Sequence, residues 1–111
     1  MSNVRKAERV QSAATTNATL VKTGSTIAFC GMVGNNGAGN AYLKFYNKAT
    51  APVVGTDVPF ATFLIPPSRN TEIELNYGFS SGLGYAITGA AADADTTAVL
   101  VNQVTGVLFY D

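Results

Sequence analysis

In residues 41–47, purely apolar side chains alternate with side chains that carry a polar group, and this pattern predicts a half-buried β-strand. Leu43 and Phe45 fall on one face of this strand, and we expect that face to point into the core. The opposite face combines aromatic and basic side chains, a composition typical of protein contact surfaces. We therefore expect an exposed contact face formed by Tyr42, Lys44 and Tyr46.

A second alternating stretch, 71–77, predicts another half-buried strand. Its acidic residues, Glu72 and Glu74, share one face and lie about 7 Å apart in an extended chain. Paired carboxylates at such a separation can act as acid and base in glycoside hydrolysis. Here they alternate with core positions, which favours a solvated strand face, and we expect no catalytic role for them.

Short runs of β-branched and aromatic residues, separated by turn residues, account for most of the remaining chain. Segment 34–40, rich in glycine and asparagine, predicts a loop, and no segment has the 3.6-residue period of a long helix. The sequence predicts an all-β, single-domain β-sandwich over 18–111, immunoglobulin-like or jelly-roll in type, with seven or eight strands. The other predicted strands are 19–21, 25–33, 60–65, 85–87 and 97–110.

Residues 1–17 differ from the rest of the chain because they are polar and contain no aromatic residue, glycine or proline. This composition predicts an N-terminal arm, extended or briefly helical, that becomes ordered on contact with another surface. Three basic residues within five positions suit docking on an acidic surface. We expect these residues, Arg5, Lys6 and Arg9, to contact a partner.

The charges are segregated along the chain although the net charge of its 111 residues is zero. Residues 1–56 carry six basic and one acidic side chain, and residues 57–111 carry one basic and six acidic side chains. Two interpretations remain open. Either the fold mixes the two halves in space, or copies or partners dock basic surface onto acidic surface.

The composition also excludes several kinds of catalytic site. The chain has no histidine, so it lacks Ser-His-Asp and Cys-His catalytic groups and zinc sites that need histidine. Its single cysteine, Cys30, lies in an apolar predicted strand, and we expect a buried, inert thiol. We therefore expect no enzyme activity and no cofactor.

The sequence gives little support for binding of a metal ion or a nucleic acid, or for a membrane span. Asp93 and Asp95 form an Asp-x-Asp pair of the kind found in calcium loops, but the alanines around them favour turn capping, so we expect no metal site. One lysine between two tyrosines, in a chain of zero net charge, argues against nucleic-acid binding. The chain contains no run of 18 apolar residues, which argues against a membrane span.

Two segments have distinctive sequences. The first is 43–59, LKFYNKATAPVVGTDVP, and the second is 82–99, GLGYAITGAAADADTTAV. Together with the closing stretch 106–110, they resemble small β-rich structural proteins of tailed phages, in particular capsid decoration (cement) proteins. The resemblance covers roughly 29–110 and brings no catalytic residue with it.

The resemblance implies a virion protein on the capsid surface that binds the lattice of the major capsid protein and stabilises the head. It also implies a homo-oligomer, with a trimer favoured by the three-fold positions of a capsid lattice. Two alternatives remain open. One is a virion β-sandwich of the tail, neck or fibre, and the other is a carbohydrate-binding β-sandwich whose tyrosine face stacks on sugar rings.

Overall fold

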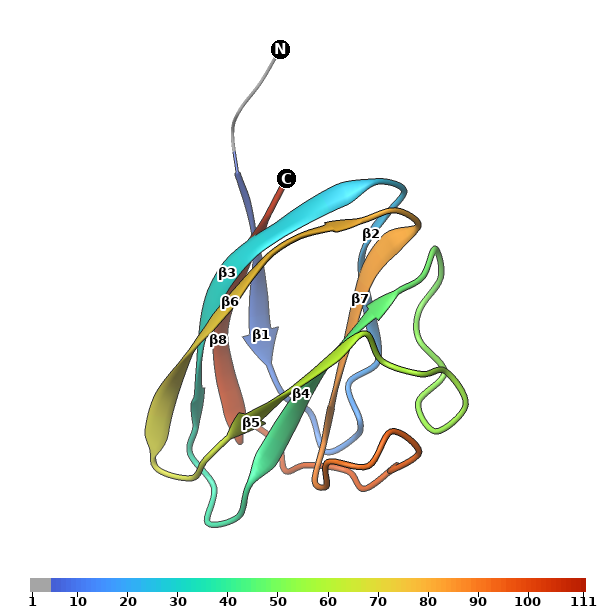
Figure 1. Cartoon of the computed structure of the whole chain (residues 1–111). Helices are drawn as coiled ribbons and strands as arrows, with labels where there is room; N and C mark the ends of the chain where they lie inside the picture. Colours follow the sequence, from blue (N-terminus) through green and yellow to red (C-terminus); the bar gives the residue numbers. More distant parts are fainter. Residues whose placement is uncertain (1–4) are drawn as a thin grey trace.

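The computed structural model describes residues 5–111 as eight β-strands in two four-stranded antiparallel sheets (Figure 1). The strands are β1 (Lys6–Gln11), β2 (Thr19–Thr23), β3 (Thr26–Asn35), β4 (Ala41–Asn47), β5 (Ala61–Ile65), β6 (Arg69–Phe79), β7 (Gly82–Thr88) and β8 (Val104–Tyr110). No helix occurs among these described residues. The predicted all-β sandwich is confirmed.

The strand order identifies the sandwich as a jelly roll. The first sheet has the order β1-β8-β3-β6, and the second sheet has the order β2-β7-β4-β5. The pairs β1/β8, β2/β7, β3/β6 and β4/β5 are all antiparallel, as in one long hairpin folded over into two layers. In the immunoglobulin-like alternative the last two strands belong to one sheet, whereas here β7 and β8 belong to different sheets.

This topology gathers the loops that follow β1, β3, β5 and β7 at one end of the sandwich (Figure 1). Neighbouring strands are antiparallel throughout both sheets, so odd-numbered strands run toward this end and even-numbered strands run away from it. We call it the four-loop end, and it consists of 12–18, 36–40, 66–68 and 89–103. Asp111 lies at the opposite end, where the chain finishes.

The core lies between the two sheets and draws side chains from both. One of its edge-to-face aromatic pairs, Phe45 and Phe63, has ring centroids 5.7 Å apart. Burying one large apolar side chain stabilises a fold by roughly 1.5–3 kcal/mol, so a core of this size holds the sandwich without a disulfide. The large side chains in the core are Val10, Val33, Leu43, Phe45, Ile65, Ile73, Phe79, Leu83, Tyr85, Ile87, Val99, Val104 and Leu108.

The first strand corrects the predicted N-terminal arm. Lys6–Gln11 pairs with β8 in regular register instead of projecting from the sandwich. Val10 anchors the strand because its side chain is 1% exposed and belongs to the core. The domain therefore includes this part of the expected arm, and the boundary at residue 17 is wrong. Residues 1–4 lie outside the described part of the chain.

The last predicted strand, 97–110, is strand over only half its length. Val104–Tyr110 pairs with β1 and β3, whereas 97–103 belongs to the four-loop end. Asp95 acts as the predicted turn cap, because its carboxylate accepts hydrogen bonds from the Thr97 backbone N–H at 3.0 Å and hydroxyl at 2.8 Å. These bonds lower the pKa of Asp95, the hydroxyl bond being the largest cause.

Candidate functional site

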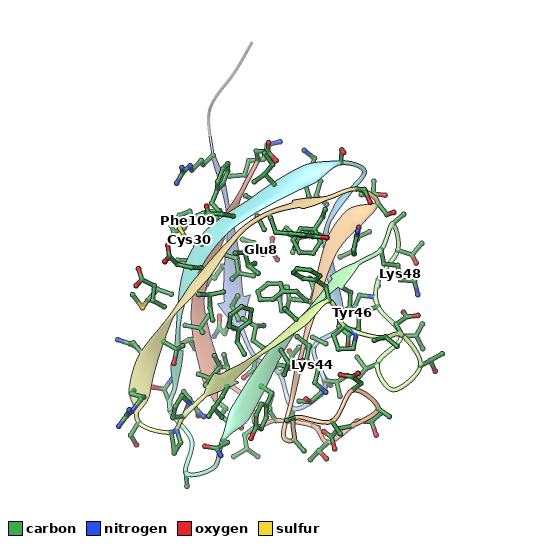
Figure 2. The ribbon with its side chains drawn as sticks, in the orientation of Figure 1. Glu8, Cys30, Lys44, Tyr46, Lys48 and Phe109 are labelled. Atoms are coloured by element: carbon green, nitrogen blue, oxygen red, sulfur yellow. The ribbon has the colours of Figure 1, made fainter. Side chains whose placement is uncertain are left out.

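The predicted contact face on β4 is covered. Lys44 and Tyr46 are 0% and 1% exposed (Figure 2). The Lys44 ammonium donates a hydrogen bond to the Ala92 carbonyl at 2.6 Å, in the loop that follows β7. Burial lowers the pKa of Lys44, and the carboxylates of Asp95 and Asp93 only partly oppose this shift. The expectation of an exposed face is therefore wrong for both residues.

The covering loops are fixed to the second sheet by close contacts. In the loop after β4, Pro52 packs so closely on Gly84 that a Cβ at the glycine would lie 3.1 Å from the proline Cδ. An ion pair between Lys48 and Asp57 ties the two ends of the same loop together. The third residue of the expected contact face, Tyr42, stays half-buried and by itself forms no face.

Tyr46 provides a direct test of this burial. Its hydroxyl has no hydrogen-bond partner among the residues that the structure describes, and burial raises its pKa. Tyr46→Phe removes an unsatisfied polar atom and keeps the ring, so we expect the free energy of unfolding to rise by about 1 kcal/mol. Urea denaturation followed by circular dichroism measures the change, with Tyr42→Phe on the same strand as the control. A clear loss of stability would show that the hydroxyl is hydrogen-bonded in solution.

The predicted basic docking residues do not form one patch. Arg5 lies with its guanidinium carbon 4.1 Å from the centroid of the Phe29 ring, and Arg9 is exposed on the same side of β1. Lys6 points to the other side of the strand, where its ammonium donates to the carbonyl of Asp111 at 3.3 Å. A docking role for the three residues stays a prediction.

Three of the buried polar side chains lie together beneath the four-loop end. Ser12, Asn35 and Gln103 are 2%, 2% and 8% exposed. A buried polar group costs free energy unless it is hydrogen-bonded, and these three side chains bond to one another's segments. They form a network, called here the buried polar network, that joins the loops after β1, β3 and β7.

Asn35, at the last position of β3, joins several segments through one amide. Its Nδ2 donates to the carbonyls of Gly39 and Ile65 at 2.9 and 2.8 Å. Its Oδ1 accepts from the backbone N–H of Gly37 at 2.9 Å and from Nε2 of Gln103 at 3.3 Å. Both donors and both acceptor positions of the amide are therefore used. The loop after β3 is thus held to β5 and to the loop before β8.

Ser12 and Gln103 hold the loop before β8 from either side. The Ser12 hydroxyl donates to the Leu100 carbonyl at 2.8 Å and accepts from the Val104 N–H at 3.0 Å. The Gln103 Oε1 accepts from the Leu100 N–H at 2.9 Å. These bonds present Leu100 and Val101 at the surface, each 65% exposed.

Residues with positive φ are concentrated at the same end. Asn17, Ser68 and Asn102 have φ values of 56°, 63° and 56°, and they are three of the four non-glycine residues with positive φ in 5–111. Asparagine adopts this conformation readily, whereas Ser68 is held in it by its surroundings, where its backbone N–H donates to the Asn35 carbonyl at 2.8 Å. The four-loop end is therefore a support tied together by hydrogen bonds that presents two apolar side chains, an arrangement typical of binding loops on a β scaffold.

Sequence reasoning missed this site because the run 97–101 has the composition of a strand. The available signal was the pair Asn102 and Gln103, which interrupts the apolar run immediately before β8. Asparagine is the residue that most readily adopts positive φ after glycine, so Asn102 marks a turn. The apolar residues before it are then on a loop, where they are free to contact a partner.

A shallow depression at the opposite end of the sandwich is a weaker candidate for a binding site. The Asp111 carboxylate accepts hydrogen bonds there from the Ile27 N–H at 2.6 Å and the Thr26 hydroxyl at 2.9 Å, and these bonds lower its pKa. The charged group is thus engaged by the chain itself rather than directed at a ligand. The depression is lined by Ser25, Thr26, Ile27, Gly78, Phe79, Ser80 and Asp111.

Comparison with family models, with curated proteins and with solved structures finds no match for this chain. Within 5–111, no three or more His, Cys, Asp or Glu side chains gather closely enough to share a metal ion. The same residues include no helix long and apolar enough to cross a membrane. The functional argument therefore rests on the surfaces of the chain and on the resemblance of its two distinctive segments.

Proposed function

We propose that this protein is a structural component of a tailed-phage virion, namely a decoration protein that binds the lattice of the major capsid protein and stabilises the head. The observation that carries the proposal is the four-loop end, where Leu100 and Val101 stand exposed on a support held by buried hydrogen bonds. The resemblance of 43–59 and 82–99 to phage decoration proteins supports the choice of partner.

The physical requirements of decoration agree with this surface. A rigid docking end loses little conformational entropy on binding, so a small apolar contact retains more of its gross binding energy. Repetition over a capsid lattice then adds avidity to each weak contact when subunits are linked. Jelly rolls occur in viral capsid proteins and in lectins, so the fold is compatible with the proposal without selecting it.

The surfaces of the protein bear differently on the two alternative functions, a tail, neck or fibre protein and a carbohydrate-binding module. A tail, neck or fibre protein would use the same surface and differ in copy number and position in the particle. A carbohydrate-binding module was expected to stack sugars on a tyrosine face, and the burial of Tyr46 removes that support. The surfaces therefore support a docking role over sugar binding, and the resemblance of 43–59 and 82–99 is what favours capsid decoration among the virion roles.

Binding to particles of the encoding phage that lack this protein tests the proposal. We expect Leu100→Asp/Val101→Asp to weaken binding by at least about 30-fold, because two desolvated apolar contacts become charged. The matched control is Val53→Asp/Val58→Asp, which makes the same change at exposed positions, 53% and 74%, in the loop after β4. The control should bind like the wild-type protein, and both variants should melt near the wild-type temperature because all four side chains are exposed.

Each outcome has a distinct meaning. Failure of the wild-type protein to bind particles would overturn the virion proposal. Full binding by the Leu100/Val101 variant would place the docking surface elsewhere. A cryo-EM map showing copies at a single vertex, rather than over the shell, would replace decoration by the tail or neck alternative.

A further inference from the structure

The outer face of the first sheet has three zones that follow its strand order. Apolar side chains occupy the centre, and two of them, Ile27 and Met32, are 41% and 45% exposed. Figure 2 shows Cys30 and Phe109 on this side of the sheet, facing away from the second sheet. Cys30 is half-buried, not buried as expected. The central zone comprises Ile27, Phe29, Cys30 and Met32 of β3 and Val107 and Phe109 of β8.

Opposite charges border this apolar centre. The β1 side presents the exposed side chains of Arg9 and of Arg5, whose guanidinium lies over the Phe29 ring, and the β6 edge presents the exposed carboxylates of Glu72 and Glu74. Alternation places Arg9 outside because its neighbour Val10 is buried in the core, and Ile73 fixes the two glutamates in the same way. An apolar centre with a charged rim is the usual anatomy of a protein–protein interface.

The register places the two charges at opposite ends of one row across the sheet. Arg9 lies beside Val107, Val107 lies beside Met32, and Met32 lies beside Glu72. The row therefore runs basic, apolar, apolar, acidic. The next row, two residues along, runs through Ala7, Phe109, Cys30 and Glu74.

A row with this order is complementary to itself under one rotation. A two-fold axis parallel to the strands, midway between β8 and β3, lays β1 of one copy over β6 of the other. Arg9 then faces Glu72 of the second copy, Glu72 faces Arg9 of the second copy, and the apolar zones meet between them. A two-fold axis across the strands would instead lay β1 over β1 and oppose like charges, which is unfavourable.

We propose that the outer face of the first sheet binds a second copy of this chain, packed sheet to sheet about the two-fold axis parallel to the strands. The contact is isologous, so it ends at two copies and differs from the trimer that the phage resemblance implies. Facing sheets pack about 10 Å apart with their strands within about 30° of each other, a range that long Arg9 and Glu72 side chains can span.

The size of the face sets the strength of the dimer. Four strands about 4.8 Å apart and about six residues long give a footprint on the order of 400 Å² per copy. That area is at the low end for specific association, so we expect a dissociation constant in the micromolar range. The same axis directs both four-loop ends to one side of the dimer, so the dimer leaves the proposed capsid contacts accessible.

The geometry of the dimer also predicts that Cys30 stays a free thiol. Two Cys30 residues lie on opposite sides of the axis, and a sheet separation of about 10 Å exceeds the Cα separation of about 7 Å at which a disulfide can form. The dimer is therefore noncovalent, and a reducing agent should leave it unchanged. Formation of the dimer should slow alkylation of Cys30, because the second copy covers the thiol.

Sedimentation equilibrium of the full chain tests the proposal without any particle, so its result is independent of the proposed virion function. We expect Arg9→Glu and Glu72→Arg each to weaken the dimer by about tenfold or more, because each creates two like-charge contacts. The double variant Arg9→Glu/Glu72→Arg exchanges the charges and should restore the wild-type constant to within a few-fold. Arg69→Glu, the same charge change at an exposed residue at the start of β6, is the control and should have no effect.

Circular dichroism separates loss of folding from loss of dimer, since all three positions are exposed and the variants should stay folded. A monomer at every concentration, or a trimer, would overturn the proposal. So would single variants that associate like the wild-type protein, or a double variant that fails to recover. Alkylation of Cys30 at a rate independent of protein concentration would also contradict it.

Discussion

Gly106→Ala is expected to lower the free energy of unfolding by at least about 3 kcal/mol, a large part of the stability of a domain of this size. Gly106 lies in β8, which pairs with β1 on one side and β3 on the other. A Cβ at this position would overlap the carbonyl oxygen of Met32 and come within 2.7 Å of the Cα of Val33. Both are backbone atoms, so no side-chain rotation relieves the overlap.

The loss of stability is expected to be large because β8 has a paired strand on each side, β1 and β3. β8 is an interior strand of the first sheet, and moving it away from β3 would break its ladder with β1 or displace that strand as well. The control is Gly39→Ala, in the loop after β3, where a Cβ would meet nothing within 4 Å. Urea denaturation followed by circular dichroism should show the loss in Gly106→Ala alone. A Gly106→Ala protein within about 1 kcal/mol of wild type would show that β8 has room to shift.

Local sequence pattern predicts the strands whose apolar residues alternate or form a run, and it misses the strand that depends on pairing with a distant neighbour. β4 and β6 alternate cleanly, and both were predicted within a few residues of their observed bounds. β1 has a single buried side chain, Val10, and otherwise reads as a polar segment. Its strand conformation comes from pairing with β8, a partner almost a hundred residues away that no local pattern reveals.

Which face of a strand is exposed depends on the loops, and this is why the predicted contact face failed. The alternation around Lys44 correctly separated two sides of β4, with Leu43 and Phe45 in the core. The second side is buried as well, because the loops after β4 and β7 fold over it and place the Ala92 carbonyl on the Lys44 ammonium. Period-two patterns cannot show that a long loop returns over the sheet.

The buried polar network was beyond prediction for a related reason. Ser12, Asn35 and Gln103 are far apart in the sequence and polar, so composition assigns all three to the surface. The jelly-roll order brings the ends of β1 and β3 and the start of β8 together at the four-loop end, where these side chains meet. The three side chains meet only because of the strand order, which could not be inferred from the sequence.

Asn35→Ala is expected to lower the free energy of unfolding by about 3 kcal/mol or more, because it leaves several buried groups without partners. The Ile65 carbonyl and the Gly37 N–H would lose their bonds to this amide, and the Gly39 carbonyl and Gln103 Nε2 would keep only their long bond of 3.4 Å to each other. The adjacent variant Asn36→Ala is the control. Asn36 is exposed and its amide makes only long hydrogen bonds of 3.3 and 3.5 Å, so denaturation should show a small change.

Comparing Asn35→Ala with a core variant separates the effect of domain stability on binding from the effect of ordered docking loops. Ile73→Ala, in the core of the first sheet, should cost a similar 2–5 kcal/mol or so through a cavity, but it leaves the buried polar network intact. At a temperature where both variants are folded, we expect Asn35→Ala to bind particles more weakly than Ile73→Ala, because its loops must be ordered on binding. Equal particle affinities would mean that the network stabilises the fold without shaping the surface that carries Leu100 and Val101.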